Sequence, residues 1–175
     1  KLLSITQSKE LELTSGVFDG LENLEVLILS SVSTSSISKI NFHDLTKLTT
    51  LEITRSDIKQ LDPEAFAYLP SLVKLNLSNN KLFINKTTFE NLERLECLNL
   101  STSLDPKMKT IDHEVFRNLS KLKSLDLSNN QLNYLDPDMF IYMHNLSELN
   151  LERNRLRLKN DTFKHLNMLN CLNLN

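Results

Sequence analysis

The chain repeats one pattern of leucines, and this periodicity limits the available folds more than any other feature. The pattern is Leu-x-x-Leu-x-Leu, followed by an Asn or a substitute for it and then by a Phe. Its blocks begin 23, 24 or 27 residues apart, at Leu24, Leu48, Leu72, Leu95, Leu122, Leu146 and Leu169. A period of this length predicts a solenoid, in which each repeat forms one coil and stacks on its neighbours.

The fourth and sixth positions of each block are apolar and alternate with polar neighbours, as in a short strand with one buried face. The sequence therefore predicts an α/β solenoid, a curved right-handed superhelix. We expect a parallel β-sheet on its concave face and short helical or irregular segments on its convex face. Residues 1–175 should form a single array of about six full repeats, with partial repeats at both ends. The partial first repeat carries Leu3, Leu11 and Phe18. Because neither end shows a capping module, we expect a larger ectodomain around this array.

Two columns of residues support this prediction. Seven of the eight phenylalanines occupy one position of the repeat, where they should fill the convex side of the core: Phe18, Phe42, Phe66, Phe89, Phe116, Phe140 and Phe163. An Asn at the ninth position can satisfy backbone groups where the chain leaves the strand. Asn80, Asn130 and Asn154 fill that position, and Ser8, Val32, Ser56 and Ser103 replace it elsewhere. Because Val offers no hydrogen bond, we expect looser turns in the N-terminal half, particularly near Val32.

The strand positions that face away from the core define the default binding surface of a solenoid. This surface should be polar, mixed in sign and poor in aromatic residues. Among its residues we select seven candidate ligand contacts: Glu52, Arg55, Lys74, Asn99, Asp126, Glu152 and Arg153. Arg55 and Arg153 belong to a residue type enriched at binding hot spots. A solvated sheet face would have the same composition, so both interpretations remain open here.

Six Asn-x-Ser/Thr sequons make a secreted or surface location plausible: Asn76, Asn85, Asn99, Asn118, Asn145 and Asn160. Several of them also follow simply from the Asn-Leu-Ser phrase of the repeat. Asn85 and Asn160 lie past their strands and are the best candidates for glycosylation. Asn76 and Asn99 should project from the concave strands, where a glycan would obstruct a protein ligand.

The cysteines predict no internal disulfide. Cys97 and Cys171 both occupy the third position of a block, three strands and therefore about 14 Å apart. A disulfide requires Cα atoms within about 7 Å of each other. We expect two partly buried thiols, or a bond from Cys171 to a residue beyond the array.

Composition excludes several functions. A net charge of −2 gives no electrostatic case for nucleic acid or for an anionic membrane, and no apolar run approaches the length of a membrane helix. The four histidines fall at scattered positions without metal-ligand spacing, and the two glycines form no phosphate-binding loop. We therefore expect no enzyme activity, no cofactor and no bound metal.

Two segments break the regular period. The repeat from Leu95 is longer than its neighbours, with its excess in residues 102–109, and residues 30–39 form an irregular Ser-rich turn. Insertions in a solenoid become loops on one flank, often the binding side. Tolerated loop variation explains both segments equally well.

The phrases Leu-Thr-Ser-Gly-Val-Phe-Asp-Gly-Leu21 and Leu-Asp-Pro-Glu-Ala-Phe66, with the period and the Phe column, resemble the typical class of extracellular leucine-rich repeats. That class includes Toll-like receptor ectodomains and secreted immune repeat proteins. The resemblance implies recognition of microbial or protein ligands in innate immunity, often with homo- or heterodimerisation through a lateral face. An extracellular adhesion or matrix protein and an intracellular interaction scaffold are the alternatives.

Overall fold

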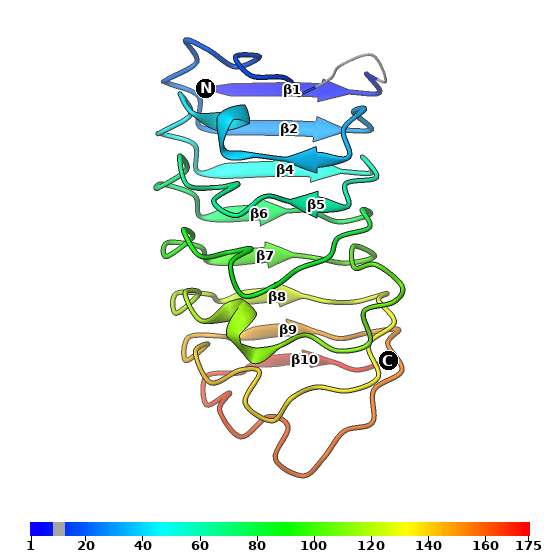
Figure 1. The fold of residues 1–175 in the computed structure, drawn as a ribbon. Coiled ribbons are helices and arrows are strands. Elements are labelled where there is room, and N and C mark those ends of the chain that lie inside the picture. Colours follow the sequence, from blue (N-terminus) through cyan, green and yellow to red (C-terminus); the bar gives the residue numbers. More distant parts are fainter. Residues whose placement is uncertain (9–12) are drawn as a thin grey trace.

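A computed structural model describes residues 1–8 and 13–175 of the chain, so Leu11 of the first partial repeat lies outside the described residues. Its main feature is an eight-stranded parallel sheet in the order β1-β2-β4-β6-β7-β8-β9-β10. Figure 1 shows these strands as stacked rungs, one for each coil of the solenoid. Their bounds are β1 Leu2–Thr6, β2 Val26–Ser30, β4 Thr50–Thr54, β6 Lys74–Asn76, β7 Cys97–Asn99, β8 Ser124–Asp126, β9 Glu148–Asn150 and β10 Cys171–Asn173.

The register of the sheet follows the leucine pattern. Leu75 of β6 pairs with Leu98 of β7, and Leu98 pairs with Leu125 of β8, so the fourth position of each block lies beside its counterparts. These three leucines are each at most 2% exposed. Every coil therefore contributes the same inward face to one continuous core, and the predicted parallel-stranded solenoid is confirmed.

The opposite side of the coil is less regular than the main sheet. Two short 3-10 helices, Lys39–Phe42 and His113–Phe116, occupy it, and α-helix is absent from the described part of the chain. A second parallel sheet joins β3 (Ser36–Ile37) to β5 (Gln60–Leu61). The sequence did not predict this small sheet, because two residues are too few to show a period. It forms where neighbouring return segments come close enough to share backbone hydrogen bonds.

The phenylalanine column forms an aromatic spine on the return side of the core. Six members are at most 4% exposed, and Phe163 in the last complete coil is half-buried. Rings in neighbouring coils stack, with centroids 6.2 Å apart for Phe89 and Phe116 and 6.4 Å apart for Phe18 and Phe42. The eighth phenylalanine, Phe83, lies outside the column and is 49% exposed. Burial therefore follows position in the repeat rather than residue type.

Buried asparagines hold the turns that follow the strands. Asn130 Oδ1 accepts the N–H groups of Ser103 and Leu104 at 3.1 and 2.9 Å, in the preceding coil. Its Nδ2 donates to the carbonyls of Leu100 at 3.0 Å and Leu127 at 2.9 Å. One side chain thus connects two coils through their backbones. Asn80 and Asn154 make the corresponding contacts.

The N-terminal turns have fewer such bonds. Ser56 Oγ accepts the N–H of Val32 at 3.2 Å and donates to the carbonyl of Thr54 at 2.9 Å. Ser103 Oγ donates only to the carbonyl of Leu77, at 2.7 Å. The side chain of Val32 can contribute none, although it is buried. Side-chain hydrogen bonding at the ninth position therefore weakens as the sequence indicates.

The residue just before this position has a left-handed backbone in every coil. Asn79 and Asn129 have φ angles of 57° and 54°, and Asn tolerates this conformation better than most residues. Arg55, Thr102 and Arg153 adopt it as well, with φ between 51° and 54°. This shared geometry turns the chain out of the sheet at the same place in each coil. It also sets the direction of Arg55 and Arg153.

Candidate functional site

The concave face contains a hollow of about 270 Å³ at its centre. The third position of the block carries small side chains there in three coils, Thr50, Cys97 and Ser124, while Lys74 projects between them. The hollow lies over β4, β6, β7 and β8. We call it the concave hollow and define it by its lining residues: Thr50, Leu51, Glu52, Lys74, Leu75, Asn76, Cys97, Leu98, Asn99, Ser124 and Asp126.

Four of the seven predicted contact residues line this hollow: Glu52, Lys74, Asn99 and Asp126. Lys74 is exposed, whereas the other three are half-buried. Asn99 Oδ1 and Asp126 Oδ1 each accept a backbone N–H two residues ahead at 2.8 Å, which fixes both side chains. The hollow therefore presents two carboxylates, one ammonium group and amides on a rigid sheet, an arrangement suited to polar contacts with a ligand.

The remaining three predicted residues lie elsewhere. Glu152 and Arg153 are at the C-terminal end of the array, where Arg153 Nε pairs with Glu152 Oε1 at 3.2 Å. The left-handed turn after β4 carries Arg55 away from the hollow. Arg55 instead borders a groove of about 720 Å³ beside the Ser-rich turn, together with Val32, Ser56 and Lys59. The sequence placed these residues on one face, and the structure separates them into three locations.

The sequons divide by exposure. Asn85, Asn145 and Asn160 are exposed on the return side or at coil edges, and Asn118 is half-buried there. Asn76 and Asn99 are half-buried in the concave hollow, and both side-chain oxygens accept backbone N–H groups. Glycans on these last two residues would occupy the hollow itself.

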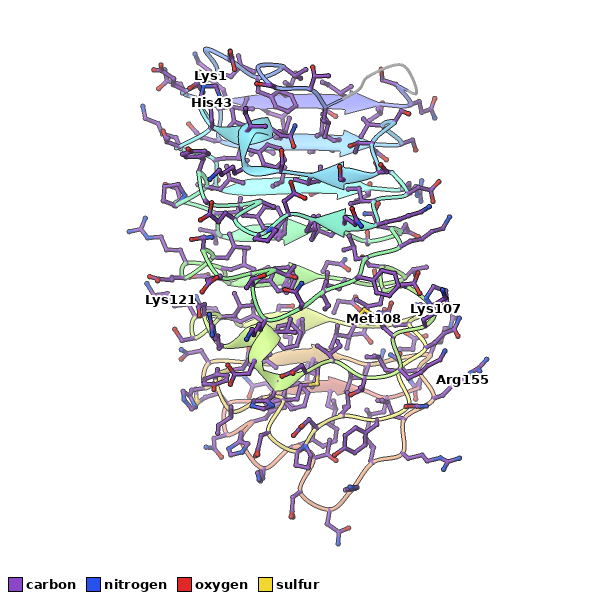
Figure 2. The ribbon with its side chains drawn as sticks, viewed as in Figure 1. Lys1, His43, Lys107, Met108, Lys121 and Arg155 are labelled. Carbon is purple, nitrogen blue, oxygen red and sulfur yellow. The ribbon has the colours of Figure 1, made fainter. Side chains whose placement is uncertain are left out.

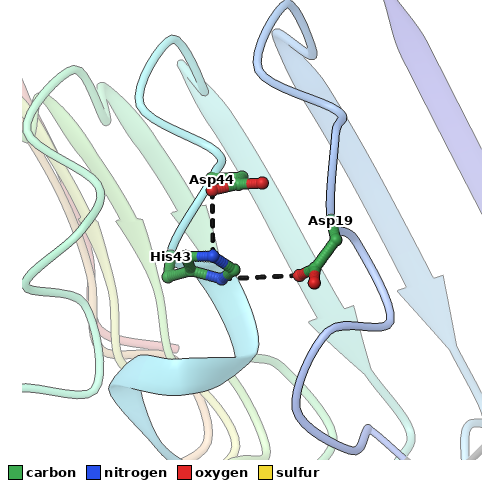
Figure 3. A group of neighbouring side chains, drawn as sticks. All are labelled: Asp19, His43 and Asp44. Carbon is green, nitrogen blue, oxygen red and sulfur yellow. Dashed lines mark ion pairs between the residues drawn. The ribbon is translucent and has the colours of Figure 1, made fainter.

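Histidines connect neighbouring coils on the return side, a feature that the sequence did not reveal. Figure 3 shows His43 between two carboxylates, with Nδ1 3.5 Å from Asp19 Oδ1 and Nε2 3.0 Å from Asp44 Oδ1. His165 lies 3.3 Å from Asp138 of the preceding coil in the same manner. Residues this distant in sequence show no local motif, so only the stacking of the coils brings them together.

The Asp19–His43–Asp44 group also meets the distance requirement for a metal site, because one ligand atom from each residue lies within 4.8 Å of the others. Its geometry fits ion pairing better. The two ring nitrogens face different carboxylates, whereas a chelate needs one nitrogen lone pair and both carboxylates directed at a single ion. Asp44 Oδ2 also accepts the N–H of Gly20 at 2.9 Å. We therefore assign this group to inter-coil contact.

Several ion pairs outside the concave hollow shift the pKa of their carboxyl groups. A hydrogen bond from Lys81 lowers the pKa of Asp57, and one from Lys39 lowers the pKa of Glu64. Lys164, with His165, lowers the pKa of Asp138. These lysines and carboxylates are exposed or half-buried and bridge adjacent coils, so the shifts reflect contacts between repeats rather than an acid–base site.

Both cysteines are free. Cys97 lies in the concave hollow and is half-buried, while Cys171 is exposed on β10. Ser124 and Glu148 separate them in the register, which agrees with the predicted absence of a bond between them. The expected partial burial is correct for Cys97 and wrong for Cys171, because β10 has no following strand in the array to cover it.

Among the described residues, no helix has the length and apolar character needed to span a bilayer. A family model for the BspA-type leucine-rich repeat region matches in six copies, over residues 1–106 and 35–174. Toll-like receptor 3 of Boselaphus tragocamelus is 30% identical over 175 residues, which are 98% of this chain and 17% of that protein. The CD180 antigen of Mus musculus is 36% identical over 101 residues, which are 55% of this chain and 15% of that protein.

Among solved structures, the TLR13 chain in its complex with single-stranded RNA superimposes with a TM-score of 0.78 at 29% identity, covering 99% of this chain and 28% of that one. The array thus spans less than a third of each of these three proteins. The repeat pattern, the stacked sheet and these matches show that the chain belongs to the leucine-rich repeat family, with repeats of the Toll-like receptor type.

Proposed function

We propose that this array is a non-enzymatic recognition module of innate immunity that acts outside the cell and binds a microbial or protein ligand through the concave hollow. The observation that carries the proposal is the grouping of Glu52, Lys74, Asn99 and Asp126 around one hollow in a rigid sheet. Relatives named as Toll-like receptors and as a CD180 antigen support the immune assignment.

The size and charge of the hollow indicate the kind of ligand. A volume of about 270 Å³ is just below the range of about 300–1,000 Å³ that encloses a small molecule. The hollow is therefore suited to part of a larger ligand, such as a protein loop or a polar group of a microbial product. Its two carboxylates would repel phosphates, so a nucleic acid is a poor ligand for this position, although the TLR13 structure contains RNA.

Removing the charges of the hollow should weaken binding. The variant E52Q/K74Q/D126S removes one cation and two anions from the hollow, and Ser at residue 126 avoids the Asn-Leu-Ser sequon that Asn would create there. Binding is measured against lipopolysaccharide, a lipopeptide, a peptidoglycan fragment and a short RNA. For whichever of these ligands binds, we expect Kd to rise about tenfold or more, which corresponds to about 1.4 kcal/mol.

The matched control K86Q/E93Q/D161N makes the same charge changes at exposed positions outside the hollow. It should leave Kd within about twofold of the unmodified chain, because surface changes away from a site have small effects. If the hollow variant bound as well as this control, the ligand would contact another surface and the proposal would be wrong.

A further inference from the structure

Five cations gather on one flank of the solenoid, at the side where the strands end. They are Lys107, Lys109, Arg155, Arg157 and Lys159, and all five are exposed. In Figure 2, Lys107 and Arg155 both project on this side. The two segments that carry them, residues 104–109 and 155–160, contain one carboxylate, Asp105, although the whole chain has a net charge of −2. We call this surface the basic flank.

The segment of residues 155–160 presents its cations by alternation. Arg155, Arg157 and Lys159 are separated by Leu156 and Leu158, and Leu156 packs against the core. In an extended segment, residues two apart point to the same side at about 6.7 Å spacing. Lys107 lies instead in a turn that the Met108 N–H closes on the carbonyl of Asp105 at 2.9 Å. Met108 packs against the core, and Lys109 follows it. The insertion that lengthens the Leu95 repeat therefore supplies the first row of cations, and the final complete coil supplies the second.

An uncharged segment, residues 131–135, lies between the two rows. The N–H of Asn133 donates to the carbonyl of Lys109 at 2.9 Å, and the N–H of Arg157 donates to the carbonyl of Asn133 at 3.0 Å. Two such steps place the rows about 10 Å apart. The segment between them exposes the amides of Gln131 and Asn133, and Lys109 Nζ donates to Gln131 Oε1 at 2.8 Å. The basic flank is thus a pair of charged rows with hydrogen-bonding groups between them.

These five cations have no carboxylate partner within 4.0 Å among residues 1–8 and 13–175. Lysines on the return side do have partners, as in Lys39–Glu64 at 2.6 Å and Lys164–Asp138 at 3.0 Å. Asp105, the acidic residue of the flank, accepts the backbone N–H of Lys107 at 2.8 Å and so stabilises its own turn. The positive potential of the flank therefore remains available to an anion from outside.

We propose that the basic flank binds a sulfated polysaccharide. Such a chain carries sulfates along both sides and hydroxyl and ether oxygens between them, which matches two cationic rows with amides in the middle. Sites for single-stranded nucleic acid usually add base stacking on free aromatic rings to the contacts of their cations. The exposed ring of Phe83 lies one coil before Lys107 and Lys109, outside the two rows. Tyr134, the aromatic residue of segment 131–135, is covered by Lys159, whose Nζ lies 5.0 Å from the ring centroid. This site is separate from the concave hollow and does not depend on its function.

The test measures binding of a heparin oligosaccharide to the whole chain at about 0.15 M ionic strength. Two variants, R155Q/R157Q/K159Q and K107Q/K109Q, each remove one row. We expect each to weaken binding about tenfold or more. For the triple variant, the slope of log K against log salt should fall by about three, one for each cation removed. Fully desulfated heparin should not bind.

The matched control K47Q/R94Q/K121Q removes three exposed cations from the opposite flank, where Figure 2 labels Lys121. It should keep heparin affinity within about twofold. An equal loss in this control would show that only overall charge matters and would overturn the proposal. Heparin binding that survives both row variants would also overturn it. So would an RNA of equal charge that binds more tightly than heparin and is lost in the same variants, because the flank would then be a nucleic-acid surface.

Discussion

Replacing Asn130 by Ala should lower the free energy of unfolding by about 4 kcal/mol. The side chain is 6% exposed, accepts two backbone N–H groups and donates to three backbone carbonyls. Each buried group left without a partner costs about 1–3 kcal/mol, and relaxation of the turn or entry of water recovers part of that cost. Denaturant unfolding of the variant and of the unmodified chain measures the difference.

Two further variants test whether the loss of stability comes from the hydrogen bonds between coils rather than from the removal of any Asn. Asn154 makes similar bonds but is only half-buried, so the effect of N154A should be smaller than that of N130A. Asn91 is exposed and outside the turn column, so N91A should change the free energy of unfolding by less than about 0.5 kcal/mol. Equal effects of N130A and N91A would show that the hydrogen bonds between coils do not stabilise the array.

Replacing Phe116 by Ala should also lower the free energy of unfolding by about 4 kcal/mol. The ring is fully buried and stacks on Phe89, with ring planes 5° apart. Removing a buried aromatic ring loses its transfer free energy and leaves a cavity, which together cost about 3–5 kcal/mol. Because each coil contacts only its neighbours, the defect should also weaken the coupling between the two halves of the array. A broader unfolding transition would report that change.

Phe83 provides the control within the same chain. It lies outside the spine and is 49% exposed, so F83A should cost less than about 1 kcal/mol. A cost for F83A as large as that for F116A would contradict the view that the column, rather than phenylalanine in general, stabilises the return side.

The sequence predicted the features that repeat with the coil. Leucine spacing located the strands, because period-two alternation and a constant repeat length are both visible along the chain. The Phe column was equally predictable, since a fixed offset from the first leucine places each ring against the next. The positions where another residue replaces Asn in this column were also visible in the sequence. Two of them, Val32 and Ser56, border the large groove beside the Ser-rich turn.

Features that depend on contacts between coils were not predictable. His43 meets Asp19 only because coils of nearly equal length stack in register, and no local motif marks that pair. The concave hollow is lined by small residues at one strand position in different repeats, which a search for charged or aromatic anchors overlooks. The left-handed turn that carries Arg55 away from the hollow is likewise a backbone property that its residue type does not indicate.

Net charge was a misleading guide to local charge. A value of −2 over the whole chain gave no electrostatic case for nucleic acid or for an anionic membrane, but charge is distributed unevenly around a solenoid. Residues 155–160 place three exposed cations on one flank. The insertion in the Leu95 repeat adds two more on the same flank. Charge counted by flank would have shown this surface, whereas charge counted over the chain did not.

The concave hollow must be free of glycans if it binds a ligand, and site-resolved mass spectrometry of glycopeptides measures whether it is. The protein would be produced in a secretory host and occupancy measured at all six sequons. We expect glycans among the exposed Asn85, Asn145 and Asn160. We expect bare side chains at Asn76 and Asn99 in the hollow. A glycan on most copies of Asn76 or Asn99 would fill the hollow and contradict ligand binding there.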